Sequence, residues 1–312
     1  MSEPQKLVVK LGLVVILPYF AGYALRKLNV LNDKHSKIGI MVYVLCFMPA
    51  VSFFAIWGIQ IGKKLKYLPL AGFIVTFTIF LISIGISYAL KLDNEKKGSF
   101  VFSNSLSNLG VTLGGIICFY FYGKEGYGKS VIYIIYFNFM LYFFCFPFAQ
   151  FLTGKKGVGF LVRLKNFFTD MRTLPLYAAL MALILTFAGV KSPKWSPQLL
   201  KILMPIASIM GVLWVGVSLR FSRIKNYLKL YPLVFFIKFI LTPLVSLAVI
   251  WVFGFTGLDR NVVLLLSFMP SALFAIYLSS FFDLDIDLAN SMYVVTTLGF
   301  FVIVLPLLLV FM

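Results

Sequence analysis

The stretch Ser103-Asn104-Ser105-Leu106-Ser107-Asn108-Leu109-Gly110-Val111-Thr112-Leu113-Gly114-Gly115 lies in the middle of an apolar segment of the chain. Glycine and asparagine are poor helix formers, so a helix through this segment is expected to break. Inside a membrane, the freed backbone groups are tolerated only beside protein or a watery cavity. The stretch therefore predicts a discontinuous membrane helix, whose second half begins near Gly114 with its positive end ready for an anion. The alternative is close helix packing through small residues.

A second interruption follows about 160 positions later, where hydrophobic blocks of the two halves also fall into register. It reads Ser267-Phe268-Met269-Pro270-Ser271-Ala272-Leu273-Phe274-Ala275, with a proline in mid-span and a serine hydroxyl beside it. Sequence identity between the two halves is low, so the evidence for a repeat is the shared spacing of the hydrophobic blocks. Two similar sets of spans, each with one broken helix, are typical of secondary transporters that bind their substrate at the membrane midplane. The two broken helices are expected to cross.

Composition supports an all-α polytopic membrane protein. Of the 312 residues, 61% are hydrophobic and 12% are charged, which is far more apolar than a soluble domain allows. Stretches of about 18 apolar residues suffice for a membrane helix. Ten are predicted, at 7–25, 38–61, 68–90, 100–122, 131–152, 174–190, 198–219, 230–253, 261–282 and 288–311. This divides the chain into a first five-helix repeat (1–153), a linker (154–173) and a second five-helix repeat (174–312).

The net charge of +18 is distributed unevenly between the two sides of the predicted membrane. The side with loop 154–173 carries 16 basic residues and the opposite side 10, which places that loop in the cytoplasm and both termini outside. The basic loops are thus an orientation signal and not a nucleic-acid site. The first span lacks a cleavage site and is expected to remain in the mature protein, as a multi-pass protein of the cell membrane. The three cysteines have no metal-like spacing.

The linker contains a predicted amphipathic helix at the cytoplasmic membrane surface. Its apolar residues recur at helical spacing while basic residues lie on the other faces, which is typical of interfacial helices. A docking helix for a regulator is the alternative. The apolar positions are Phe160, Leu161, Leu164, Phe167, Phe168 and Met171.

Charged residues within spans are rare. All ten acidic residues fall in predicted loops or tails, which argues against a proton pump with an intramembrane carboxylate. Sodium coupling through carbonyls and hydroxyls remains open. Lys238 is predicted deep in the eighth span, either attracting an anion, bonding carbonyls of a broken helix, or extending to the cytoplasmic surface. Asn138 is a polar candidate in span five, with helix–helix hydrogen bonding as its alternative. No catalytic set, cofactor motif or metal cluster is evident, so no enzyme is expected.

Several motifs resemble the auxin efflux carrier family, which includes plant PIN proteins and bacterial organic-acid permeases. They are Ser107-Asn108-Leu109-Gly110, the run 121–126, Asn138, the run 210–219, Met269-Pro270 and the C-terminal run 296–307. The resemblance implies two inverted five-helix repeats, with broken crossing helices in spans four and nine. It also implies a scaffold and a transport subdomain, a homodimer, and a role for Asn108 near the substrate carboxylate. The family usually has a proline where this chain has Gly115 and Ala275, so Pro270 is expected to provide the second break.

Together these observations predict a carrier that moves a small organic anion by elevator-like alternating access. A sodium-coupled symporter for organic or bile-acid-like acids is the alternative, and coupling to protons is also open. From another class, a sensor built on a transporter fold is the further alternative. No cofactor and no nucleic-acid partner are expected. The predicted substrate-binding residues are Asn108, Gly110, Thr112, Gly114, Gly115, Asn138, Lys238, Pro270 and Ser271.

Overall fold

The computed structural model describes residues 9–60, 62, 64–110, 112–154, 159–218 and 224–311. Within these ranges every regular element is a helix, and the one extended pairing is an isolated antiparallel bridge. The chain forms two compact units, and each unit takes segments from both halves of the sequence. Unit 1 comprises 1–68, 109–135 and 170–219, and unit 2 comprises 69–108, 136–169 and 220–312.

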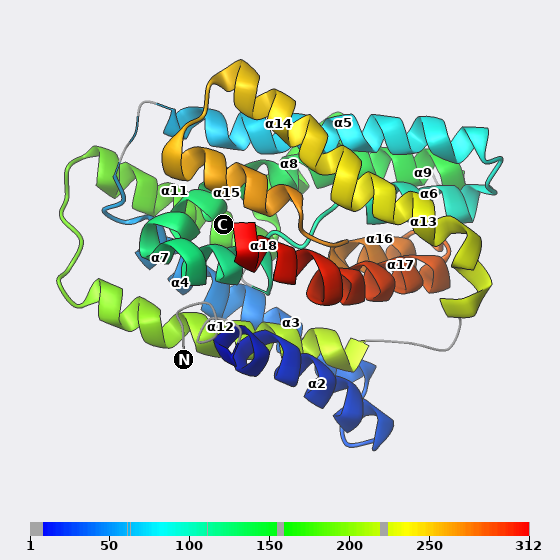
Figure 1. Cartoon of the computed structure of the whole chain (residues 1–312), viewed down its shortest axis with the longest axis horizontal. Coiled ribbons are helices and arrows are strands. Elements are labelled where there is room, and N and C mark those ends of the chain that lie inside the picture. The colour runs from blue at the N-terminus through cyan, green and yellow to red at the C-terminus, as the bar shows by residue number, and fades with distance from the viewer. Residues whose placement is uncertain are drawn as a thin grey trace. The chain divides into compact units, whose positions relative to one another are not determined.

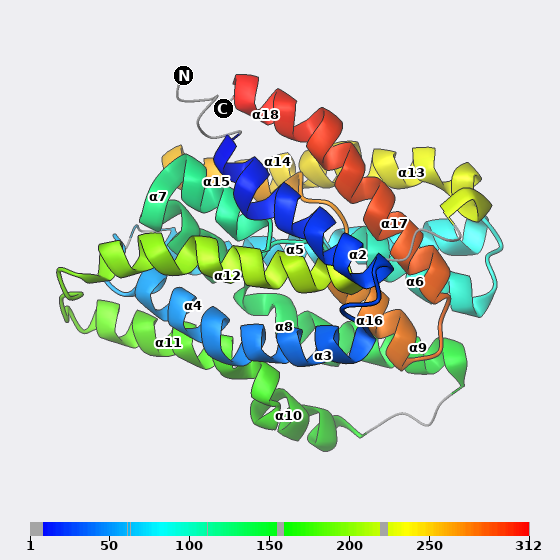
Figure 2. The same cartoon turned by 90° about the horizontal axis from the view of Figure 1, so that it is seen from below.

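Unit 1 consists of long apolar helices packed in pairs. In Figure 2, α2 lies along α12 and α4 lies along α11. Between α3 and α12, the Ser36 hydroxyl donates to the carbonyl of Trp214 at 3.0 Å. The helices of this unit are α2 (Leu17–Lys27), α3 (Asp33–Val42), α4 (Met48–Ile56), α7 (Gly114–Tyr133), α11 (Leu174–Phe187) and α12 (Ser196–Ser218).

The contact between α2 and α12 depends on two glycines. A Cβ placed on Gly22 would overlap the carbonyl oxygen of Leu213, and one placed on Gly216 would overlap the carbonyl oxygen of Tyr19. The backbones of the two helices therefore touch directly, as small residues permit in membrane proteins. At the end of α12, the Arg26 guanidinium donates to the carbonyl of Val217 at 2.8 Å.

Unit 2 contains the remaining helices around a buried apolar cluster of Ile79, Phe100, Val234, Ile237, Leu288 and Met292. Figure 1 shows α16 beside α17, and α14 beside α15. Ser99 of α6 and Ser279 of α16 share a buried hydrogen bond of 2.8 Å. The helices are α5 (Leu68–Ala89), α6 (Asn94–Ser105), α8 (Phe137–Met140), α9 (Phe146–Thr153), α10 (Phe160–Thr169), α13 (Tyr231–Phe236), α14 (Thr242–Phe253), α15 (Gly257–Ser267), α16 (Leu273–Phe281), α17 (Ile286–Gly299) and α18 (Leu305–Phe311).

A recurrent local feature of the described spans is a wide π-helical turn just before a proline. The residue preceding each proline donates to a carbonyl five positions back, as Leu17 does to Gly12 and Thr242 to Ile237. Proline lacks an N–H and its ring would clash with the carbonyl four positions back, and a wider turn relieves both problems. These turns are Gly12–Ile16, Tyr43–Phe47, Leu141–Cys145, Ile237–Leu241 and Phe300–Val304, before Pro18, Pro49, Pro147, Pro243 and Pro306.

Among the described residues, seven helices are long and apolar enough to cross a membrane. They are 9–27, 34–56, 65–89, 114–153, 196–217, 224–253 and 286–310. The ten predicted spans exceed this number for three reasons. The stretches 100–122 and 261–282 are interrupted, 174–190 forms a helix of only 14 residues, and 131–152 continues from α7. The count of ten is therefore not confirmed.

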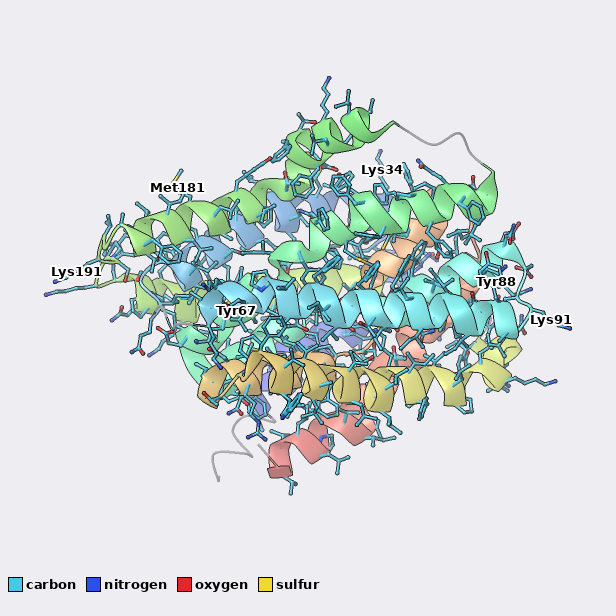
Figure 3. All side chains as sticks on the ribbon, turned by 90° about the horizontal axis from the view of Figure 1, so that it is seen from above. Lys34, Tyr67, Tyr88, Lys91, Met181 and Lys191 are labelled. Carbon is cyan, nitrogen blue, oxygen red and sulfur yellow. The ribbon has the colours of Figure 1, made fainter. Side chains whose placement is uncertain are left out.

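The span 65–89 has the ends expected of a membrane helix. Figure 3 shows Tyr67 just before the start of α5 and Tyr88 near its other end, with Lys91 beyond Tyr88. Both tyrosine side chains are exposed. At 1.5 Å per residue they lie about 30 Å apart along the helix, close to the thickness of the hydrocarbon core. Tyrosine is enriched at both membrane interfaces, which supports a membrane-spanning α5.

Two further helical segments are the linker and a glycine-rich run of α7. Residues Phe160–Thr169 of the linker form helix α10, and the Phe167 ring packs on Tyr142 and Phe143 within unit 2. The place of this helix at the cytoplasmic membrane surface stays a prediction. Linker residues 155–158 lie outside the described residues. The glycine-rich run Gly123–Gly128 falls within α7. Only Gly123 departs from helical geometry, with a φ of 64°, and α7 resumes directly after it. Glycine adopts this left-handed conformation without a Cβ clash.

Candidate functional site

Both predicted interruptions are present. Helix α6 ends at Ser105 and α7 begins at Gly114, while α15 ends at Ser267 and α16 begins at Leu273. Leu106 and Ala272 have extended backbones instead of helical ones. The second break centres on Pro270, as expected, and Ala275 lies inside α16.

The two extended segments of unit 2 pair with each other. Ser107 and Ser271 form the antiparallel bridge. The amide of Ala272 donates to the carbonyl of Leu106 at 2.9 Å, and the amide of Asn108 donates to the carbonyl of Pro270 at 2.8 Å. Helix ends leave amides and carbonyls unbonded, and within a membrane these must find partners in the protein. The pairing supplies partners for part of both breaks. We call residues 106–108 with 270–272 the crossover.

Lys238 is bonded to the crossover. Its side chain is 0% exposed, and its ammonium donates to the carbonyl of Leu106 at 3.0 Å and to the hydroxyl of Ser107 at 2.9 Å. No carboxylate in the described part of the chain pairs with it. Of the sequence-based alternatives, extension to the membrane surface is wrong, and bonding to a carbonyl of a broken helix is what the structure shows. Attraction of an anion stays a prediction.

Lys238 lies in the π-helical turn Ile237–Leu241, where the Thr242 hydroxyl donates to the carbonyl of Ile237 at 2.7 Å. A π-turn is a local widening of a helix and is frequent at functional sites. The turn exists because Pro243 comes next.

Ser271 is held by its backbone while its hydroxyl is left without a partner. The amide of Ser271 donates to the Thr296 hydroxyl of α17 at 3.2 Å, and that hydroxyl donates to the carbonyl of Met292. The Ser271 Oγ is fully buried and has no hydrogen-bond partner in the described structure. A buried hydroxyl without a partner is costly, so such a group is a candidate ligand contact. Ser103 Oγ, Asn104 Oδ1 and Thr297 Oγ1 of unit 2 are also buried without a partner there.

The two predicted asparagines also belong to unit 2. Asn108 is half-buried in the crossover. Asn138 is half-buried in α8, next to Phe137, whose ring packs on Phe274 in the first turn of α16 at 5.5 Å. Both therefore lie on segments that adjoin the second break.

The other predicted residues lie in unit 1, at the start of α7. The amides of Leu113 and Gly115 both donate to the carbonyl of Gly110, at 3.1 and 2.7 Å, and Gly114 is the first residue of α7. A Cβ on Gly115 would come within 2.8 Å of the Tyr127 ring, whereas one on Gly110 would meet nothing. A Cβ on Gly211 of α12 would come within 2.9 Å of the Thr112 methyl group. Gly115 and Thr112 are thus packed within unit 1.

Sequence reasoning missed the acceptors of Lys238. Leu106 contributes through its backbone, which no residue type reveals. Ser107 stands inside the quoted motif and was not selected, although its hydroxyl next to Asn108 was an available signal. Thr296, which positions Ser271, lies in the C-terminal run that was noted only for its resemblance.

Most acidic side chains of the described chain lie at helix starts or in connections. Glu125 departs from the prediction that all acidic residues fall in loops or tails, because it lies within α7, two residues after the kink at Gly123, and accepts from the amide of Gln60 at 3.2 Å. Asp93 and Asp285 cap α6 and α17, and Glu95, Asp259 and Asp287 lie in first turns, where the helix dipole favours negative charge. Partial burial opposes ionisation of Asp93, but hydrogen bonds from Lys96 outweigh it and lower the pKa. No metal-binding group of His, Cys, Asp and Glu occurs among the residues searched.

This placement predicts how transport depends on pH. With a substrate that stays fully ionised, uptake is expected to show no titration of a buried acid between about pH 5 and 8. The measurement is initial uptake by proteoliposomes across this range. A steep dependence that disappears in a single Asp or Glu variant would contradict the prediction.

No protein-family model matches the chain. It is 26% identical over 309 residues to a protein named as an uncharacterized transporter of Methanocaldococcus jannaschii, covering 94% of this chain and 96% of that protein. It is also 24% identical over 288 residues to an uncharacterized transporter of Methanothermobacter thermautotrophicus, covering 92% of each. The chain is thus a multi-pass helical membrane protein that is similar, over nearly its whole length, to proteins named as transporters.

Proposed function

We propose that this protein is a secondary carrier that moves a small organic anion by alternating access. The observation that carries the proposal is a buried lysine bonded to the meeting point of two broken helices, with no carboxylate partner in the described structure. A buried charge without a counter-ion is costly, and an anionic ligand would compensate for it. Intramembrane charges of this kind usually mark a substrate or ion pathway.

The proposed substrate is a carboxylate because of the donors in unit 2. A lysine ammonium has three N–H donors, and two of them are used by Leu106 and Ser107. The third can bond a carboxylate oxygen, and the hydroxyl of Ser271 and the amide side chain of Asn108 supply further contacts from the crossover. The residues at the start of α7 in unit 1, Gly110 to Gly115, remain a sequence prediction.

The resemblance to auxin efflux carriers extends the proposal. It supports ten helices in two inverted five-helix repeats, an elevator-like movement, a homodimer and a location in the cell membrane. In this proposal unit 2, which contains the crossover, is the transport subdomain, and unit 1 is the scaffold. The glycine-mediated contact of α2 with α12 supports a rigid unit 1.

The test of the proposal is flux of isotope-labelled carboxylates into proteoliposomes. A preceding thermal-shift screen of carboxylates selects the anion to label. Saturable uptake that stops when Lys238 is replaced by Met supports a carrier. Binding without flux would favour the sensor instead, and no binding of any carboxylate would contradict the substrate class.

Orientation can be tested separately. The charge distribution predicts that a cysteine at position 2 reacts with a membrane-impermeant reagent in intact cells and that one at position 156 does not. Both positions lie outside the described residues. Because native Cys46 is exposed, the background should carry Cys46→Ser. The reverse labelling pattern would contradict the predicted orientation.

A further inference from the structure

The two acceptors of Lys238 are the kind of ligands that bind a sodium ion. The ammonium contacts one backbone carbonyl, from Leu106, and one hydroxyl, from Ser107. Hard monovalent and divalent cations prefer such neutral oxygens together with carboxylates. The carbonyl is made available by the break after α6, and it also accepts from the amide of Ala272. The ammonium of Lys238 therefore bonds to the first broken helix at the place where that helix pairs with the second.

We infer that Lys238 is a resident cation of the crossover, that it occupies oxygens which a sodium ion could otherwise use, and that sodium does not bind at this place in the natural protein. The inference deepens the proposed function, on which it rests where transport is concerned, because it excludes sodium coupling through the crossover. Its test is a stability measurement, so the result does not depend on whether transport is observed.

Charge repulsion explains why lysine and sodium exclude each other. Two positive charges a few ångströms apart repel more strongly in a protein interior than in water, because the effective dielectric is lower there. No carboxylate in the described structure offsets this repulsion at the crossover. A sodium ion bound to the Leu106 carbonyl would share that oxygen with the Lys238 ammonium and would therefore lie close to it. The lysine therefore prevents sodium from binding there.

Removing the lysine leaves oxygens that a small cation can use. Lys238→Ala removes one of the two donors to the Leu106 carbonyl, which keeps its bond from the amide of Ala272, and removes the ammonium from the Ser107 hydroxyl. It also leaves space where the side chain was. Further acceptors without a partner in the described structure occur in the same unit, at Ser271 Oγ, Ser103 Oγ, Asn104 Oδ1 and Thr297 Oγ1. The variant is therefore expected to gain a response to sodium that the natural protein lacks.

The experiment measures Tm of the purified protein in NaCl and in choline chloride at equal concentration. The natural protein is expected to have the same Tm in both salts. Lys238→Ala is expected to have a lower Tm in choline and a saturable rise of several degrees with sodium, because a ligand that binds only the folded state stabilises it. Lys238→Ser provides a second variant with an added oxygen ligand.

Two controls separate a cation from general damage. Lys229→Ala removes an exposed lysine of the same span and is expected to change neither Tm nor the sodium response. Ser107→Ala removes one acceptor and keeps the ammonium, so it is expected to lower Tm without creating a sodium response. Yield of monodisperse protein in each salt gives the same comparison for a variant that does not survive purification in choline.

Either of two results would overturn the inference. The first is sodium-specific stabilisation of the natural protein. The second is that neither Lys238 variant responds to sodium more than the natural protein does, in Tm or in yield. Carboxylate flux that fails in the presence of a clear sodium response of Lys238→Ala would instead refute only the proposed function.

Discussion

Gly22→Ala and Gly216→Ala are each expected to lower Tm strongly and to reduce the yield of folded protein. In both cases the new methyl group would overlap a carbonyl oxygen of the facing helix, which is backbone and cannot rotate away. The helices α2 and α12 must then separate along their contact. Overpacking of this kind costs about 1–3 kcal/mol, and contacts with backbone fall at the upper end. Thermal denaturation in detergent measures the effect.

Gly12→Ala is the matched control, since Gly12 lies in the same span and a Cβ there meets nothing within 4 Å. It should leave Tm nearly unchanged or raise it, because alanine favours a helix more than glycine does. The double variant at Gly22 and Gly216 should cost less than the sum of the single ones, because both methyl groups push apart the same crossing. Equal Tm values for Gly12→Ala and Gly22→Ala would show that α2 and α12 do not touch as described.

Asn108→Ala is expected to weaken carboxylate binding by about ten- to a hundredfold. Losing one directed hydrogen bond to a charged group costs roughly 1.5–3 kcal/mol. Stability should be retained, because the bond that Asn108 makes to the carbonyl of Pro270 comes from its backbone amide and survives the change. Titration of the substrate by thermal shift, or the concentration dependence of flux, measures the affinity.

Asn166→Ala, on the exposed face of α10, is the control for this change. Unchanged affinity in a well-folded Asn108→Ala protein would remove Asn108 from the proposed site and leave Lys238 and Ser271.

Gly115 was predicted as a substrate-binding residue, but Gly115→Leu would not test binding directly. Its side chain would meet the Tyr127 ring at 2.8 Å within unit 1, so a loss of function there reports on packing.

The breaks were predictable because they follow from local chemistry. Asn108, Gly110 and Gly114 disfavour a helix over a few residues, and Pro270 removes a backbone donor, so each break can be located from its own neighbourhood. The start of α7 at Gly114 was located in this way.

What the sequence could not supply is contact between distant segments. Lys238 and Ser107 are 131 positions apart, and the choice between three roles for the lysine depends on which carbonyl it reaches. Composition also does not show which glycines of a run interrupt a helix. Of the three glycines at 123–128, only Gly123 adopts a left-handed backbone, and the buried glycines after it allow tight packing. Gly128, for example, leaves no room for a Cβ beside the carbonyl of Ala55.

The wide turns before prolines have a mechanical consequence. Sharp bends in helices occur at prolines and at π-helical turns. We therefore expect these spans to bend, where they bend, at 12–16, 43–47, 141–145, 237–241 and 300–304. The turn at 237–241 contains Lys238, so a bend there is expected to change the bonds between its ammonium and the crossover.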